Sequence, residues 1–262
     1  MKTFKQFLLE SQPYPNPEEF AGKLLQECTQ FLTESGFNPE DADGTGIIRG
    51  SEQAPVFTPL TTPTSRRPLT SSADTHYTVD TYLKKQFGTP FRSHSIFVCR
   101  DMDTVINYGS PFMIFPIGDF KYCWSPKIDD LFYYITNIDT RIDMILAIVD
   151  TERGTTTLST RAPERAEKIR QFKKQGKNAE ARAEAKAMLE YLNPDDLDDI
   201  MRDWLYTGNS EYRTDGLREA IRKYPKNEIM IADCKYYALP WGENGSEGRD
   251  WTEKVFKSMK SL

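Results

Sequence analysis

Hydrophobic positions near the start of the chain recur at helical spacing and are framed by residues typical of helix ends. The apolar stripe consists of Phe20, Leu24, Cys28 and Phe31. Asn16 and Pro17 stand where a helix would begin, and Gly36 stands where it would end. The pattern predicts a helix that packs on the core. The same spacing after residue 78 predicts a second helix, closed by Gly88.

Short stretches rich in aromatic and β-branched residues predict the strands. They read GTGIIRG, FRSHSIFVC, PFMIFPIG, FKYCWS and NEIMIADCKYYAL. The third and fourth stretches are joined at Gly118 and Asp119, and the last is predicted to be a hairpin that turns at Asp233 and Cys234. Glu228 stands at the mouth of this otherwise apolar hairpin, where a carboxylate needs an explanation.

From Ile128 to about Gly208 the pattern becomes helical and ends in a charged, alanine-rich run. Acidic residues are interleaved with basic ones in that run, which favours a solvent-exposed helical face over an RNA-binding surface. The segment 251–262 predicts one closing amphipathic helix. Helices inserted between strands predict the α+β class, and the absence of a long internal linker predicts a single domain over residues 13–262.

Composition narrows the kinds of protein to be considered. The formal net charge of −5 argues against broad binding to nucleic acid through its phosphates. The four cysteines form no CxxC pair and both histidines stand far from them in sequence, so no metal site is expected. No apolar run approaches the roughly 20 residues that span a bilayer. Because no secretion signal is recognised, we expect reduced thiols in the cytoplasm. We also expect no membrane contact. Cys99 and Cys234 stand in strand-like surroundings and are expected to be buried.

Three polar features stand near the ends of predicted strands. They are Arg49 with Gly50, Ser93 with Ser95, and Glu228. Taken alone, each has an ordinary structural explanation as a surface ion pair, as solvent-facing strand residues or as an edge charge that prevents aggregation. In this order, however, IIRG, FRSHSIFV and NEIMIADCKYYAL resemble the Arg, Ser-x-Ser and Glu motifs of the mono-ADP-ribosyltransferase family. The three motifs span residues 47–239, which is most of the chain.

This resemblance implies a split β-sheet core with flanking and inserted helices, and NAD as the substrate. Arg49 would hold the NAD pyrophosphate with a planar guanidinium fork that lysine does not reproduce, and Gly50 would let the backbone come close. Ser93 would hydrogen-bond the nicotinamide ribose and hold Glu228 in place, with Ser95 in support. The Glu228 carboxylate would stabilise the oxocarbenium ion that forms when the nicotinamide bond breaks.

Other positions near these motifs leave alternatives open. Tyr108 and Phe115 each have two interpretations. Either residue could stack on nicotinamide, or it could pack in the core. His94 replaces the Thr that family members carry between the two serines, and we expect it in packing or in solvent. Lys226 stands where arginine-modifying members carry a second acidic residue, so arginine is the less favoured acceptor.

A second resemblance concerns the first ten residues, MKTFKQFLLE. This segment is similar to the capsid-targeting peptides of proteins packaged inside the heads of large contractile-tailed bacteriophages. Such peptides are trimmed after an apolar-x-Glu site, which here ends at Glu10. Residues 1–12 are therefore expected to direct the protein into the phage head. The alternative is an amphipathic helix that docks on its own domain.

Together, the two resemblances imply a phage-encoded, NAD-dependent mono-ADP-ribosyltransferase that passes from the virion interior into the host cytoplasm. Its acceptor is expected to be a host macromolecule, either protein or nucleic acid. The long loop 51–72 and the segment 207–226 are expected to select that acceptor. Two alternatives remain: a virion structural protein with an inactive ADP-ribosyltransferase-like fold, and an NAD glycohydrolase toxin that uses water as the acceptor.

Overall fold

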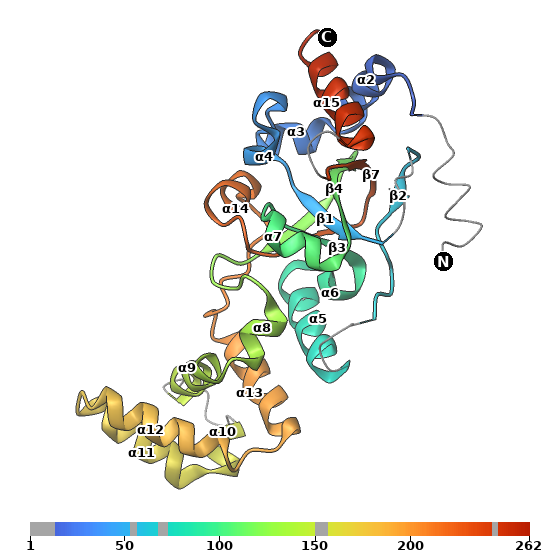
Figure 1. The fold of residues 1–262 in the computed structure, drawn as a ribbon. Coiled ribbons are helices and arrows are strands. Elements are labelled where there is room, and N and C mark those ends of the chain that lie inside the picture. Colours follow the sequence, from blue (N-terminus) through green and yellow to red (C-terminus); the bar gives the residue numbers. More distant parts are fainter. Residues whose placement is uncertain (1–13, 53–56, 68–72, 150–156, 243–245) are drawn as a thin grey trace, which may run out of the picture. The chain divides into compact units, whose positions relative to one another are not determined.

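The computed structural model describes residues 14–52, 57–67, 73–149, 157–242 and 246–262 (Figure 1). Helices and antiparallel strands occur together in these ranges, which confirms the α+β class. Contacts divide the chain into two compact units. Unit 1 comprises Met1–Arg66, His94–Asp129 and Arg213–Leu262, and unit 2 comprises Arg67–Ser93 and Asp130–Tyr212. Residues 13–262, predicted as a single domain, are divided between the two units, and the peptide predicted over residues 1–12 lies outside the described residues.

Unit 1 contains two antiparallel sheets. The larger sheet has the strand order β1-β4-β7-β2, and the smaller sheet has the order β3-β6-β5. The strands are β1 (Ile48–Ser51), β2 (Leu60–Thr61), β3 (Ser95–Val98), β4 (Ser110–Ile117), β5 (Lys121–Trp124), β6 (Ile229–Ala232) and β7 (Lys235–Pro240).

The connections that follow β4 and β6 both pass from one sheet to the other. β4 belongs to the larger sheet and β5 to the smaller one, and the chain turns between them at Gly118, whose φ is 63°. β6 and β7 are divided between the sheets in the same way, and Asp233 between them has a φ of 57°. The predicted hairpin is therefore wrong. Glu228 precedes β6, which is the central strand of the smaller sheet and is buried at all four positions.

Helices surround the sheets of unit 1. They are α2 (Pro17–Glu27), α3 (Thr29–Ser35), η1 (Pro39–Asp41), α4 (Ala42–Thr45), α7 (Met102–Val105), η2 (Ile106–Tyr108), α14 (Leu217–Lys223) and α15 (Glu247–Met259). The predicted first helix is confirmed, with a break at Cys28. Asn16 Oδ1 accepts from the backbone N–H groups of Glu18 and Glu19 at 2.9 and 3.1 Å, and Gly36 ends α3 in the left-handed conformation. α2 and α15 lie side by side (Figure 1).

The core of unit 1 is rich in aromatic rings. Phe115 is fully buried, and its ring centroid lies 5.6 Å from that of Phe31, 5.1 Å from that of Phe37 and 5.9 Å from that of Phe256. These contacts make Phe115 a core residue, as one of the two interpretations of the sequence expected. All four cysteines are buried and unbridged, which confirms the prediction for Cys99 and Cys234.

Unit 2 is helical. Its helices are α5 (Ala73–Phe87), α8 (Leu131–Thr136), α9 (Ile138–Val149), α10 (Thr157–Arg161), α11 (Pro163–Lys174), α12 (Asn178–Leu189) and α13 (Pro194–Tyr206). The predicted end of α5 at Gly88 is confirmed by its φ of 78°. The charged run forms α11 and α12, which lie side by side (Figure 1). Glu184 pairs with Arg165 at 2.6 Å and with Lys168 at 2.7 Å, while Ile169 and Met188 are fully buried.

Candidate functional site

Arg49 lies in the second position of β1, opposite Phe112 of β4, and is half-buried. The phenol of Tyr236 in β7 lies near the Arg49 guanidinium. Burial raises the pKa of Tyr236, and the positive charge of Arg49 opposes that rise. The phenol beside Arg49 is thus neutral. The guanidinium has five N–H donors, enough for a two-pronged contact to a phosphate.

Glu228 lies directly before β6 and is half-buried. Its backbone N–H donates to the carbonyl oxygen of Asp129 at 2.8 Å. β6 pairs with β3 so that Ile229 lies opposite Val98. The next position of this antiparallel register places Glu228 beside Cys99. Burial raises the pKa of the Cys99 thiol to about 12, and the negative charge of Glu228 adds to that rise, as expected of neighbours.

The two sheets of unit 1 are joined next to both of these residues. Ile48 N–H donates to the Cys99 carbonyl at 2.7 Å, and Cys99 N–H donates to the Ile48 carbonyl at 3.0 Å. Arg49 follows Ile48 directly, and Glu228 lies beside Cys99. Because adjacent strands are about 4.8 Å apart, the backbones of Ile48 and Glu228 are about 10 Å apart. The register therefore places the backbones of two of the predicted site residues near the bridge that joins β1 to the end of β3.

Two glycines allow the end of β1 to lie close to α7 and η2. A Cβ atom on Gly50 would lie 2.3 Å from the carbonyl oxygen of Val105 and 2.8 Å from Cβ of Tyr108. A Cβ atom on Gly109, whose φ is 118°, would lie 2.6 Å from the backbone of Ser51. The close approach observed at Gly50 is thus to its own chain, and the predicted approach to a pyrophosphate stays a prediction. Tyr108 is 51% exposed, which removes the core-packing interpretation for this residue.

Ser93 and His94 lie in a helical turn, α6 (Phe91–His94), so the prediction of a strand from Phe91 is wrong at its start. Ser93 donates to the Pro90 carbonyl through its backbone N–H at 3.2 Å and through its hydroxyl at 3.3 Å, which closes the turn. Ser93 belongs to unit 2 and Glu228 to unit 1. The predicted contact between Ser93 and Glu228 therefore stays a prediction.

Ser95 is the first residue of β3 and is fully buried. It lies opposite Ala232, four positions along β6 from Glu228. At about 3.3 Å per residue, this register separates Ser95 from Glu228 by about 13 Å. The structure thus groups Arg49, Gly50, Tyr108 and Glu228 near one junction and places Ser95 away from it.

Sequence reasoning missed Tyr236 and Asn227. Tyr236 stands next to Tyr237 in an aromatic strand in which both side chains are buried, so no alternation marked it as a partner of Arg49. Asn227 is 8% exposed, and its Nδ2 donates to the Ser125 carbonyl at 2.7 Å. A polar residue before an apolar strand usually belongs to a loop, so only the fold could identify this buried contact.

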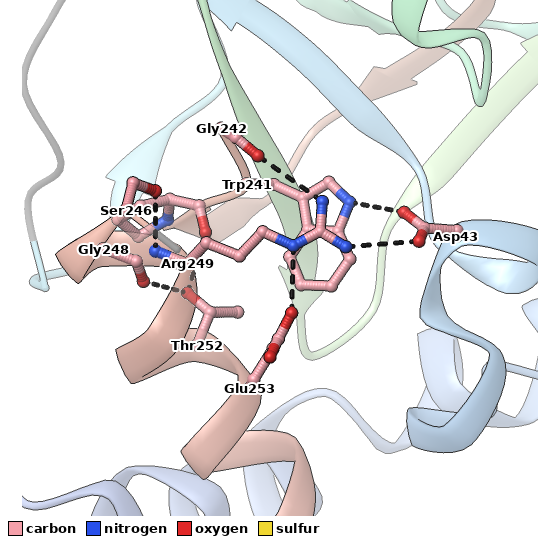
Figure 2. A network of polar contacts seen from close by, with 9 residues as sticks. Asp43, Trp241, Gly242, Ser246, Gly248, Arg249, Thr252 and Glu253 are labelled. Carbon is pink, nitrogen blue, oxygen red and sulfur yellow. Dashed lines mark hydrogen bonds and ion pairs between the residues drawn. The ribbon is translucent and has the colours of Figure 1, made fainter. Parts of the chain in front are cut away.

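A separate polar network fixes the segment that leads into β1 (Figure 2). The Arg249 guanidinium lies 3.9 Å from the ring centroid of Trp241 and pairs with Asp43 at 3.2 Å and with Glu253 at 3.0 Å. The other carboxylate oxygen of Asp43 accepts from the Trp241 indole at 2.9 Å. These partners engage Arg249 within the protein, so the network clamps α4 rather than offering a ligand site.

The second contact on α4 comes from the segment beside Glu228. Arg100 Nη1 donates to the carbonyl oxygen of Gly44 at 3.1 Å. α4 ends three residues before β1 begins, so both contacts restrain the entry to the strand that holds Arg49.

Within the described ranges, no group of three or more His, Cys, Asp or Glu side chains could hold a metal ion. None of the helices described there is long and apolar enough to cross a membrane. Neither a model of a known protein family, nor a curated protein, nor a solved structure matches this chain.

Proposed function

We propose that this chain is an NAD-dependent mono-ADP-ribosyltransferase, encoded by a bacteriophage, that modifies a host macromolecule. The observation that supports this proposal most is the Ile48–Cys99 junction, because it gathers Arg49 and Glu228 from opposite ends of the chain. A cation for a pyrophosphate and a carboxylate for a developing positive charge are the two groups that cleavage of NAD requires. The division of the strands between two antiparallel sheets agrees with the proposed ADP-ribosyltransferase-like core.

In this proposal, ground-state binding of NAD depends on Arg49 and Tyr108. Arg49, oriented by Tyr236, binds the pyrophosphate through paired N–H groups. The exposed ring of Tyr108 stacks on the nicotinamide or on another planar part of NAD. Gly50 contributes by allowing η2, and Tyr108 with it, to lie against β1. Ser93 remains a proposed contact to the ribose side of NAD, whereas Ser95 is fully buried opposite Ala232 and makes no contact to NAD in this proposal.

The chemical step breaks the glycosidic bond between nicotinamide and ribose C1′. The bonding electron pair leaves with nicotinamide, which becomes neutral, and the ribose acquires oxocarbenium character. Glu228 stabilises that positive charge electrostatically. A nucleophilic atom of the acceptor then bonds to C1′ and loses its proton, which completes the transfer. No metal ion is required in this scheme.

The test is incubation of the purified protein with labelled NAD and host extract, followed by separate protease and nuclease treatment. Label in a macromolecule, sensitive to one of the two enzymes, supports the proposal and identifies the acceptor class. Release of nicotinamide without a labelled macromolecule would indicate an NAD glycohydrolase. If NAD neither reacts nor raises the melting temperature, the chain is better explained as a virion structural protein with an inactive fold.

The proposal also covers location. Residues 1–12 would target the protein to the phage head interior, from which it enters the host cytoplasm with the DNA. Deleting residues 1–10 should leave NAD turnover close to normal and abolish packaging. Loss of folding after the deletion would instead favour a helix that docks on its own domain.

A further inference from the structure

We propose that Asn227 is a positioning residue for the catalytic carboxylate, an inference that rests on the proposed function of Glu228. Asn227 precedes Glu228 directly and is 8% exposed. Burying an amide is costly unless its polar atoms are hydrogen-bonded, so a buried Asn beside a catalytic residue calls for a structural reason.

The reason lies in the end of the β5–β6 ladder. Trp124 and Ile229 form the last pair of that ladder. Beyond it, the Asn227 side chain donates to the Ser125 carbonyl at 2.7 Å, and Glu228 N–H donates to the Asp129 carbonyl at 2.8 Å. These bonds continue the attachment of the two segments past the point where regular pairing stops.

The opposite side of the same segment is held by the chain that follows β3. The backbone N–H groups of Arg100 and Asp101 both donate to the Pro225 carbonyl, each at 2.9 Å. Asp101 is itself fixed as the N-cap of α7, because its carboxylate accepts from Thr104 N at 2.9 Å and from the Thr104 hydroxyl at 2.6 Å. Residues 225–228 are therefore restrained from both flanks.

Among these restraints, the Asn227 bond comes from a side chain, whereas those to Pro225 and from Glu228 join backbone atoms. Substitution can thus remove it and leave the others in place. A catalytic carboxylate acts by lying where charge develops, and a misplacement of about 1 Å can cost about 100-fold in rate. Loss of the Asn227 bond should therefore affect the chemical step more than the binding of NAD.

The test uses Asn227→Asp, which keeps the shape of the side chain and places a carboxylate oxygen against the Ser125 carbonyl. We expect kcat to fall about 10- to 100-fold, with KM and the dissociation constant for NAD changed less than about twofold. The matched control is Gln30→Glu in α3, where Nε2 also donates a hydrogen bond, to the Glu34 carboxylate at 2.9 Å. The control should keep the kcat of the unsubstituted protein.

Stability is measured in parallel by thermal unfolding, and kinetics are measured well below the melting temperature. If Asn227→Asp does not fold, Asn227→Ser replaces it, because the shorter hydroxyl does not reach the Ser125 carbonyl and adds no charge. An unchanged kcat in the folded variant would overturn the positioning role while leaving the proposed function intact. An unsubstituted protein without NAD chemistry would instead overturn the proposed function itself.

Discussion

Ile48 and Cys99 exchange two backbone hydrogen bonds, of 2.7 and 3.0 Å, at the point where the two sheets of unit 1 meet. This pair connects the strand of Arg49 to the strand that flanks Glu228. Since backbone bonds do not depend on side-chain identity, the junction survives substitution of the side chains around it. The contributions of Arg49, Tyr236 and Glu228 can thus be measured one at a time in the same fold.

Arg49→Lys should weaken NAD binding although the positive charge is retained. Lysine offers a compact ammonium in place of the planar guanidinium, whose N–H groups can form two parallel hydrogen bonds to a pyrophosphate. We expect a loss of about 1–3 kcal/mol in binding free energy, measured by calorimetric titration with NAD. Arg218→Lys serves as the control, because this exposed arginine donates to the Thr33 carbonyl away from the junction. Equal affinity in both variants would show that Arg49 does not contact the phosphate.

Tyr236→Phe should weaken NAD binding by a smaller amount. The substitution removes the phenol oxygen, which we propose orients Arg49, and leaves the ring in place. A loss of about 0.5–1.5 kcal/mol is expected for one hydrogen bond. Tyr237→Phe is the matched control, since that phenol donates to Glu27 at 2.9 Å instead. The control should lower the melting temperature without changing NAD affinity, and an equal loss of affinity in both would contradict an orienting role for Tyr236.

Gly50→Ala should destabilise the fold. The new methyl group would lie 2.3 Å from the Val105 carbonyl oxygen, which is backbone and cannot swing away. Forced overpacking of this kind costs about 1–3 kcal/mol, measured as the free energy of unfolding in urea. Gly22→Ala in α2 provides the contrast, because nothing lies within 4 Å of the added carbon. That variant should gain about 0.5–1 kcal/mol from helix propensity. A neutral Gly50→Ala would mean that η2 is free to move from β1.

The cysteines should resist alkylation in the folded protein at pH 8. Burial raises the pKa of Cys28, Cys99 and Cys234 to about 12 in each case and also raises that of Cys123, so the reactive thiolate is scarce. Folded thiols hold their protons more tightly than unfolded ones, whose pKa is about 8.5. Their contribution to stability is therefore complete below about pH 8.5 and is lost as the pH rises toward 12. Mass spectrometry after iodoacetamide treatment, with and without denaturant, measures this protection. Rapid labelling of the folded protein would contradict it.

Periodic apolar patterns predicted the helices well because they depend on local spacing. The stripe of α2 and α3 and the glycine that ends α5 follow from side-chain geometry within a few turns. The pairing of strands did not follow in the same way. β6 and β7 are adjacent in the chain and belong to different sheets, because each finds its partners among strands distant in sequence.

For the candidate site, the sequence supplied the residues and the structure supplied their positions. Arg49 and Glu228 were proposed from the resemblance of their motifs to the mono-ADP-ribosyltransferase family, and the register places their backbones near one junction. Ser95 was expected in support of Glu228, but the register of β3 against β6 places it opposite Ala232. The apolar pattern of a single sequence does not distinguish registers that differ by two residues, since such a shift keeps the same face buried. Asn227 was missed because its side chain donates a hydrogen bond to a residue that is distant in sequence, Ser125.

Glu228→Gln tests the central claim most directly. The amide matches the carboxylate in shape, so the melting temperature and the affinity for NAD should stay close to those of the unsubstituted protein. The charge that opposes the oxocarbenium ion is lost, and removal of one such group commonly costs 10²- to 10³-fold in rate, or about 3–4 kcal/mol. Single-turnover release of nicotinamide from labelled NAD should therefore slow by at least about 100-fold. A variant that folds normally and releases nicotinamide at the unsubstituted rate would contradict the assignment of Glu228 as the catalytic carboxylate.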